Sequence, residues 1–112
     1  MPHPSHELEI IPVDVKKLLD EGVDFRFLDV RTPHERALAC IEPSSLLSED
    51  LTRKALETWA KDTKIILYCH SGIRSLGAAE YFSRQGGFQD VKSMAGGITA
   101  WSAIIDASIP TY

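Results

Sequence analysis

Short apolar runs alternate along this chain with stretches whose apolar residues recur at helical spacing. The apolar runs predict strands over residues 8–11, 25–30, 64–68 and 88–92. The helical stretches cover residues 13–20, 33–38, 49–60 and 75–85, with a final helix that begins at residue 98. Residues 40–47 predict an irregular connection with room for a brief strand. Because strands and helices alternate, we expect an α/β fold with a small, mostly parallel sheet flanked by helices on both faces.

The length and composition predict one water-soluble domain. The chain has 112 residues, which is enough for one core and too few for two. Residues 1–7 lack periodicity, so we expect a loose leader before a single domain over residues 8–112. No segment approaches the roughly 18 apolar residues of a membrane span. The N-terminus also lacks the basic and apolar regions of a secretory signal. We therefore expect a cytoplasmic protein without a membrane partner.

The charge of the chain argues against a nucleic-acid partner. Its formal net charge is −4, and no basic stripe is present that could neutralise phosphates. A small anionic ligand is still compatible with this charge. Exposed charges farther away than about 8 Å are largely screened, whereas loop amides and Arg74 would lie next to the bound anion.

The loop that follows the predicted strand at residues 64–68 is where we expect the chemistry. It runs from the strand to the next helix through Cys69, His70, Ser71, Gly72, Ile73, Arg74 and Ser75. In parallel sheets, ligands bind outside the carboxyl ends of the strands. A helix N-terminus presents unpaired N–H groups and partial positive charge, which stabilise a thiolate and an adjacent oxyanion. We therefore predict that Cys69 is a reactive nucleophile.

The neighbours of Cys69 have narrower predicted roles. A cation is disfavoured at a helix N-terminus, so Arg74 needs an anionic partner, either the substrate or a neighbouring carboxylate. Gly72 is expected to adopt a positive φ that lets the loop amides converge. We expect His70 to line the pocket without acting as an obligatory base. The hydroxyls of Ser71 and Ser75 could donate hydrogen bonds to the sulfur or to sulfonate oxygens, but for Ser75 we mainly expect a helix cap.

Three segments together resemble a single-domain rhodanese, a sulfurtransferase. They are Leu-Asp-Val-Arg-Thr-Pro-His-Glu at 28–35, Cys-His-Ser-Gly-Ile-Arg-Ser at 69–75 and Ala-Gly-Gly-Ile-Thr-Ala-Trp at 95–101. The resemblance covers nearly the whole chain and implies a small rhodanese-like α/β fold. It also implies that Cys69 takes a sulfane sulfur from a donor such as thiosulfate and becomes a persulfide. The sulfur then passes to cyanide or a thiol.

The resemblance further implies which residues bind the donor and which partners take part. The loop amides and the Arg74 side chain would bind the sulfur-donor anion, with substrate-binding positions at His70, Ser71, Gly72, Ile73, Arg74 and Ser75. The acceptor would be cyanide or a thiol, including that of a thioredoxin-like or sulfur-carrier protein. No cofactor is implied. No metal is predicted, because the cysteines and histidines lack paired ligand spacing of the zinc type.

Two other functions are compatible with these residues. A non-catalytic module of the same fold would bind a partner or sense oxidants through Cys69. A phosphatase or arsenate reductase would use the same thiolate. Phosphatases with a similar loop place the arginine one residue later, whereas only four residues separate Cys69 from Arg74 here. The shorter loop therefore favours sulfur chemistry.

A second thiol, Cys40, lies where the sequence departs from the family. The family usually has a Gly-His-Ile-Pro-Gly-like segment there, whereas residues 39–43 are Ala-Cys-Ile-Glu-Pro. The conformation of residues 38–46 is therefore left open. Cys40 could resolve a persulfide on Cys69 only if the two thiols approached closely. Without an export signal, two free thiols are favoured over a disulfide.

Four other residues that could be taken for functional groups have simpler structural roles. Asp29 and Arg31 follow a predicted strand, and we expect them to form a structural ion pair instead of a catalytic one. Trp59 and Trp101 lie on apolar helix faces, and we expect both to be core residues.

Overall fold

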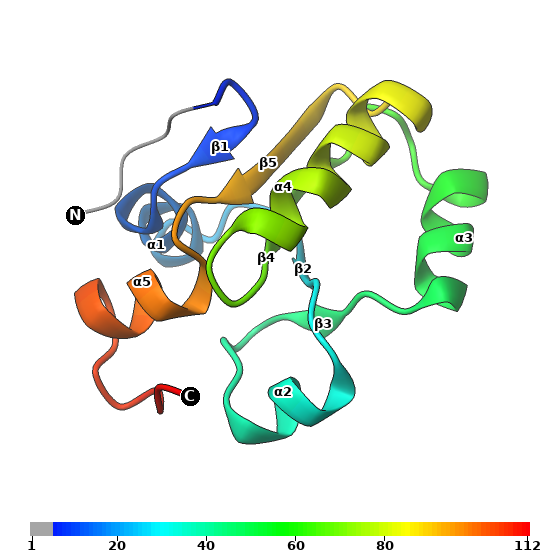
Figure 1. Cartoon of the computed structure of the whole chain (residues 1–112). Coiled ribbons are helices and arrows are strands. Elements are labelled where there is room, and N and C mark those ends of the chain that lie inside the picture. The colour runs from blue at the N-terminus through cyan, green and yellow to red at the C-terminus, as the bar shows by residue number, and fades with distance from the viewer. Residues whose placement is uncertain (1–5) are drawn as a thin grey trace.

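The structure is a computed structural model, which describes residues 6–112. Its elements are β1 (Glu9–Ile10), α1 (Pro12–Asp20), β2 (Arg26–Asp29), α2 (Pro33–Leu38), β3 (Ser45–Leu46), α3 (Glu49–Thr58), β4 (Lys64–Tyr68), α4 (Ile73–Glu80), a π-helical turn (Tyr81–Gln85), β5 (Asp90–Met94) and α5 (Gly97–Ile104). The strands form a five-stranded sheet in the order β1-β5-β4-β2-β3, and every neighbouring pair is parallel. The predicted α/β fold is confirmed (Figure 1).

A hydrophobic core covers each face of the sheet, because alternate residues of the buried strands point to opposite sides. In the central strand β4, Ile66 and Tyr68 belong to one core, which also contains Val15 of α1 and Trp101 of α5. The other core contains these buried residues: Leu28, Ala55, Ile65, Leu67, Ala79, Phe82, Phe88 and Val91. Thus α1 and α5 cover one face, and α3 and α4 cover the other (Figure 1). The carboxyl end of β4 is held from both sides.

Several element boundaries differ from those expected. The predicted strand at 88–92 lies at Asp90–Met94, because the N–H groups of Phe88 and Gln89 bond to the carbonyls of Phe82 and Lys61 instead of a strand. The predicted strand at 8–11 is reduced to Glu9–Ile10, because Leu8 lies in a turn and Ile11 is the N-cap of the next helix. The strand and helix expected at 25–30 and 49–60 are shorter, at Arg26–Asp29 and Glu49–Thr58.

The helix after Cys69 begins earlier than expected. It was predicted over 75–85, whereas α4 starts at Ile73 because Gly72, in a left-handed conformation, is its N-cap. After Glu80 the helix continues as the π-helical turn Tyr81–Gln85. The start of α4 matters for the site, because it places two additional backbone N–H groups in the first helical turn.

The segment whose conformation the sequence left open is anchored to β4. The Ile41 N–H donates to the Tyr68 hydroxyl at 3.1 Å, and Ser44 Oγ lies 2.9 Å from the same oxygen. The brief strand for which residues 40–47 had room is confirmed as β3, which pairs with β2.

Residues 1–5 of the predicted leader lie outside the described residues. His6 and Glu7 lead into β1 through a turn, in which His6 Nδ1 accepts a hydrogen bond from the Leu8 N–H at 3.0 Å. Over residues 6–112, no helix is both long and apolar enough to cross a membrane.

Candidate active site

Cys69 lies at the carboxyl end of β4, directly beneath the N-terminus of α4. Its side chain is buried, with 1% of the residue exposed. The sulfur accepts hydrogen bonds from the N–H groups of Gly72 at 3.1 Å and Ser75 at 3.3 Å, and from Ser75 Oγ at 3.4 Å. Three donors therefore converge on one buried thiol, an arrangement that stabilises negative charge on the sulfur.

Gly72 makes this convergence possible. Its φ is +105°, which confirms the predicted positive value, and a Cβ there would lie 3.1 Å from the Gly96 nitrogen. Only glycine adopts this conformation without strain. The N–H groups of Ile73 and Arg74 belong to the first turn of α4, where helix geometry provides no intrahelical acceptor. They are therefore positioned to bind an anion next to the sulfur.

The N-terminus of α5 supports the loop from behind. Ile98 N–H donates to the Cys69 carbonyl at 2.8 Å, and Thr99 N–H donates to the His70 carbonyl at 3.2 Å. Gly97 lies so close to this backbone that a Cβ would be 2.5 Å from the His70 carbonyl oxygen and closer still to that of Cys69. Its φ is also positive, at +60°. The close approach explains why a glycine stands here.

Ser75 is not the helix cap that its position suggested; its hydroxyl instead donates to the Cys69 sulfur, which was the alternative expected for it. It is the third residue of α4, and its hydroxyl lies 2.7 Å from Ser93 Oγ, as well as within reach of the Cys69 sulfur and the Gly72 carbonyl. The helix entrance is buried here, so the hydroxyl bonds inward. Sequence reasoning missed Ser93. Its only signal in the sequence was its position directly after the predicted strand at 88–92.

Arg74 forms a two-pronged ion pair with Glu35 of α2. Nη1 and Nη2 lie 2.7 and 2.9 Å from the two carboxylate oxygens, so a neighbouring carboxylate is the partner of Arg74. The guanidinium holds the pKa of Glu35 well below its usual range. Glu35 also completes a capping box with Thr32, which fixes the start of α2. The Arg74 side chain is 44% exposed, whereas that of Glu35 is 15% exposed.

Tyr112, which sequence reasoning did not single out, contacts Glu35, Arg31 and His70. Its hydroxyl donates to Glu35 Oε2 at 2.9 Å and accepts from Arg31 Nη1 at 2.9 Å. Its ring stacks on His70 with centroids 4.2 Å apart. Burial raises the pKa of Tyr112, so its hydroxyl stays protonated and able to donate. The tail returns from α5 toward α2, as Figure 1 shows.

The ion pair expected between Asp29 and Arg31 is present and buried. Arg31 Nε and Nη2 lie 2.7 and 2.8 Å from the two Asp29 oxygens. Arg31 also donates to the Ala39 carbonyl at 2.6 Å, and Arg36 donates to Asp29 at 3.0 Å. Burial disfavours the charged guanidinium, but the bonds to Asp29 and Tyr112 outweigh it and raise the pKa of Arg31. The pair therefore has the structural role predicted for it.

The remaining predicted loop positions face outward. The Ile73 residue is 80% exposed, and Ser71 is also exposed. Ile73 would therefore contact an anion beside Cys69 through its backbone N–H and not through its side chain.

Of the two tryptophans, Trp101 lies in the core as predicted. Trp59 is only partly buried, and the Arg26 guanidinium lies 4.8 Å from its ring centroid.

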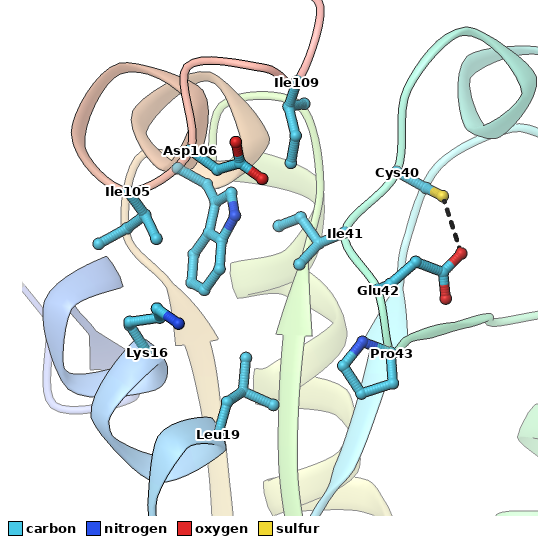
Figure 2. A pocket seen from close by; sticks show the side chains of 10 residues that line it. Lys16, Leu19, Cys40, Ile41, Glu42, Pro43, Ile105, Asp106 and Ile109 are labelled. Atoms are coloured by element: carbon cyan, nitrogen blue, oxygen red, sulfur yellow. Dashed lines mark hydrogen bonds between the residues drawn. The ribbon is translucent and has the colours of Figure 1, made fainter.

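The hydrogen-bond partner of the second cysteine, Cys40, lies outside the loop that surrounds Cys69. Both cysteines are free thiols. Cys40 borders a cavity of about 410 Å³ between α1, α5 and the segment before β3, and Cys69 is not among the lining residues (Figure 2). The Cys40 thiol faces Glu42, with Sγ 3.6 Å from Oε1. Burial raises the pKa of Cys40.

Within residues 6–112, no three His, Cys, Asp or Glu side chains form a cluster that could hold a metal ion.

Comparison with known proteins places this geometry in a family. The family model for the rhodanese-like domain matches residues 12–104. The thiosulfate sulfurtransferase GlpE of Pseudoalteromonas translucida is 39% identical over 87 residues, which cover 78% of this chain and 81% of that protein. The adenylyltransferase and sulfurtransferase MOCS3-2 of Zea mays is 34% identical over 108 residues, which cover 88% of this chain.

The chain spans only about a fifth of the length of the maize relative, since the match covers 22% of it. Among solved structures, a rhodanese-like domain protein from Staphylococcus aureus superposes with a TM-score of 0.72 at 27% identity, covering 93% of this chain and 97% of that one. This chain belongs to the rhodanese-like domain family.

Proposed function

We propose that this protein is a sulfurtransferase in which Cys69 carries a sulfane sulfur as a persulfide between a donor and a thiophilic acceptor. The observation that carries the proposal is the buried Cys69 sulfur, which accepts hydrogen bonds from two backbone N–H groups and the Ser75 hydroxyl. These donors stabilise a thiolate. They would also stabilise the same sulfur when it leaves during the second transfer.

With thiosulfate as donor, the reaction divides into two displacements. The Cys69 thiolate attacks the outer sulfur of thiosulfate, the S–S bond of the donor breaks, and sulfite leaves with the bonding electrons. An acceptor thiolate or cyanide then attacks the terminal sulfur of the persulfide, and Cys69 leaves as a thiolate. One difficult transfer thus becomes two through a covalent intermediate, which predicts ping-pong kinetics.

The donor's sulfonate group has suitable partners beside Cys69. The N–H groups of Ile73 and Arg74 in the first turn of α4 would donate hydrogen bonds to its oxygens, and the half-exposed Arg74 guanidinium adds positive charge nearby. The name of the GlpE relative supports thiosulfate as donor. We propose a cytoplasmic reaction with a thiol acceptor, including a thioredoxin-like or sulfur-carrier protein, since cytoplasmic thiols are kept reduced.

Intact-protein mass spectrometry after incubation with thiosulfate tests the carrier. Wild type and the matched control Cys40→Ser should each gain the mass of one sulfur atom, and a reductant should remove it. Cys69→Ser should gain nothing. A gain on Cys69→Ser but not on Cys40→Ser would move the carrier to the other thiol. No gain on folded wild type with thiosulfate or an organic persulfide would instead favour the non-catalytic binding or oxidant-sensing module.

A further inference from the structure

Two serine hydroxyls from different elements meet behind the Cys69 sulfur. Ser75 of α4 and Ser93 of β5 are both fully buried, with their oxygens 2.7 Å apart. Ser93 pairs in register with Leu67 of β4, whose side chain faces the core beneath α4. A hydroxyl in such surroundings needs hydrogen-bond partners, because burial without them is unfavourable. The direction of each bond can therefore be derived from the number of protons and acceptors.

Ser75 has one proton and three neighbouring acceptors. These are the Cys69 sulfur at 3.4 Å, the Gly72 carbonyl at 3.3 Å and Ser93 Oγ at 2.7 Å. Ser93 Oγ, in contrast, has Ser75 as its only hydrogen-bond partner in residues 6–112. Ser75 can therefore donate to any of three acceptors, whereas Ser75 Oγ is the one acceptor for the Ser93 proton among the described residues.

Only one direction of the hydrogen bond between Ser75 and Ser93 uses both protons. If Ser75 donated to Ser93, the Ser93 proton would lack an acceptor and the Cys69 sulfur would lose a donor. If Ser93 donates to Ser75, the Ser75 proton is free to bond to the sulfur. A buried donor without an acceptor is the more costly alternative. A hydroxyl that accepts a hydrogen bond also becomes a stronger donor.

We infer that Ser93 is a positioning residue for Cys69: by donating to Ser75 it leaves the Ser75 proton available to the Cys69 sulfur and makes that proton a stronger donor. This inference deepens the proposed function and rests on it. Without the Ser93 hydroxyl, Ser75 Oγ loses the hydrogen bond that it accepts, so the Ser75 proton becomes a weaker donor to the sulfur. The hydrogen bond from Ser75 to the Cys69 thiolate is then weaker, so a smaller fraction of the thiol is ionised at a given pH.

The test is the pH dependence of sulfur loading in a Cys40→Ser background. Ser93→Ala should load sulfur from thiosulfate about fivefold more slowly at low pH, the effect of roughly one hydrogen bond. Its rate should converge with that of the parent at high pH, where the thiol is fully ionised. The profile therefore moves to higher pH. Ser102→Ala, which removes another buried hydroxyl that donates to the Ile109 carbonyl at 2.7 Å, should keep the parent profile.

A double-mutant cycle separates positioning from general damage to the fold. If Ser93 acts through Ser75, adding Ser93→Ala to Ser75→Ala should cause no further shift of the pH profile. Independent, additive shifts would overturn the inference. So would a Ser93→Ala profile identical to that of the parent.

A second measurement distinguishes failure of the inference from failure of the proposed function. The ultraviolet absorbance of the Cys69 thiolate, taken against Cys69→Ser at each pH, requires no sulfur donor. If the parent takes up no sulfur, the proposed function fails, while the absorbance of Ser93→Ala still tests the inference. Thiolate formation at higher pH in Ser93→Ala supports it, and an unchanged titration contradicts it.

Discussion

The two parts of the candidate active site are built in different ways. The floor consists of Cys69, Gly72 and Ser75, which lie within seven consecutive residues and are buried. The rim consists of Arg74, Glu35, His70 and Tyr112, with contacts that join residues 39 to 77 positions apart. Backbone N–H groups dominate the floor, whereas side chains form the rim.

Under the proposed function, this difference separates chemistry from recognition. The floor supplies donors whose direction is set by the loop and by two helix N-termini, so a change there would disturb the hydrogen bonds to the Cys69 sulfur. The rim depends on partly exposed side chains, whose ion pairs contribute little stability. Substitutions at the floor should therefore affect folding and chemistry together. Substitutions at the rim should mainly change how well the donor binds.

The largest effect is expected at the support of the floor. Gly97→Ala would place a Cβ against the Cys69 and His70 carbonyls at φ +60°, so it should destabilise the protein by about 3 kcal/mol. Gly87→Ala is the matched control, because Gly87 has a similar φ of +73° with nothing within 4 Å of its Cβ position. It should lose only about 1 kcal/mol. Urea unfolding measures the free energy of unfolding of both variants. Equal decreases would show that contact with the two carbonyls is not the cause.

At the rim, we expect opposite effects on donor binding from the two partners of one ion pair. Arg74→Ala removes positive charge beside the anion site and should raise KM for thiosulfate about fivefold. Glu35→Gln removes the opposing negative charge and should lower KM about twofold. The rate constant for sulfur loading at saturation should change little in either variant. Steady-state kinetics at low and high salt checks this, because screening should weaken both effects. A large fall in kcat with unchanged KM would assign Arg74 to the chemistry of the floor.

The smallest effect is the pH-dependent stability of the rim. Arg74 lowers the pKa of Glu35, so this carboxylate stabilises the folded state above its unfolded pKa of about 4.3. That contribution is lost as the pH falls below this value. Because Arg74 is 44% exposed, we expect only about 0.5 kcal/mol. The stability difference between wild type and Glu35→Gln should therefore be present at neutral pH and shrink in acid. A difference that stays constant would mean that another interaction causes it.

The floor was largely predictable, because its signals are local. A buried strand, a cysteine, a glycine-containing loop and a helix occur consecutively, and they place Cys69 and the positive φ of Gly72 correctly. Ser75 was misassigned because serine favours both helix caps and inward hydrogen bonds near a helix start. The sequence alone does not say which side of the helix entrance is buried.

The rim was only partly predictable, because its contacts are long-range. The need of Arg74 for an anion followed from helix electrostatics, but the choice of Glu35 depends on how α2 packs beside α4. Tyr112 had no local signal, since its partners lie on other elements. Similarly, β5 was shifted by two residues because distant carbonyls bind the N–H groups of Phe88 and Gln89.

The stacking of Tyr112 on His70 has a practical consequence for fusion proteins. His70 directly follows Cys69, so a segment attached behind Tyr112 would leave the fold at the entrance to the site. A purification tag there would compete with the donor for space. A tethered acceptor domain would hold its thiol close to Cys69, where the effective concentration reaches the millimolar range for short flexible linkers.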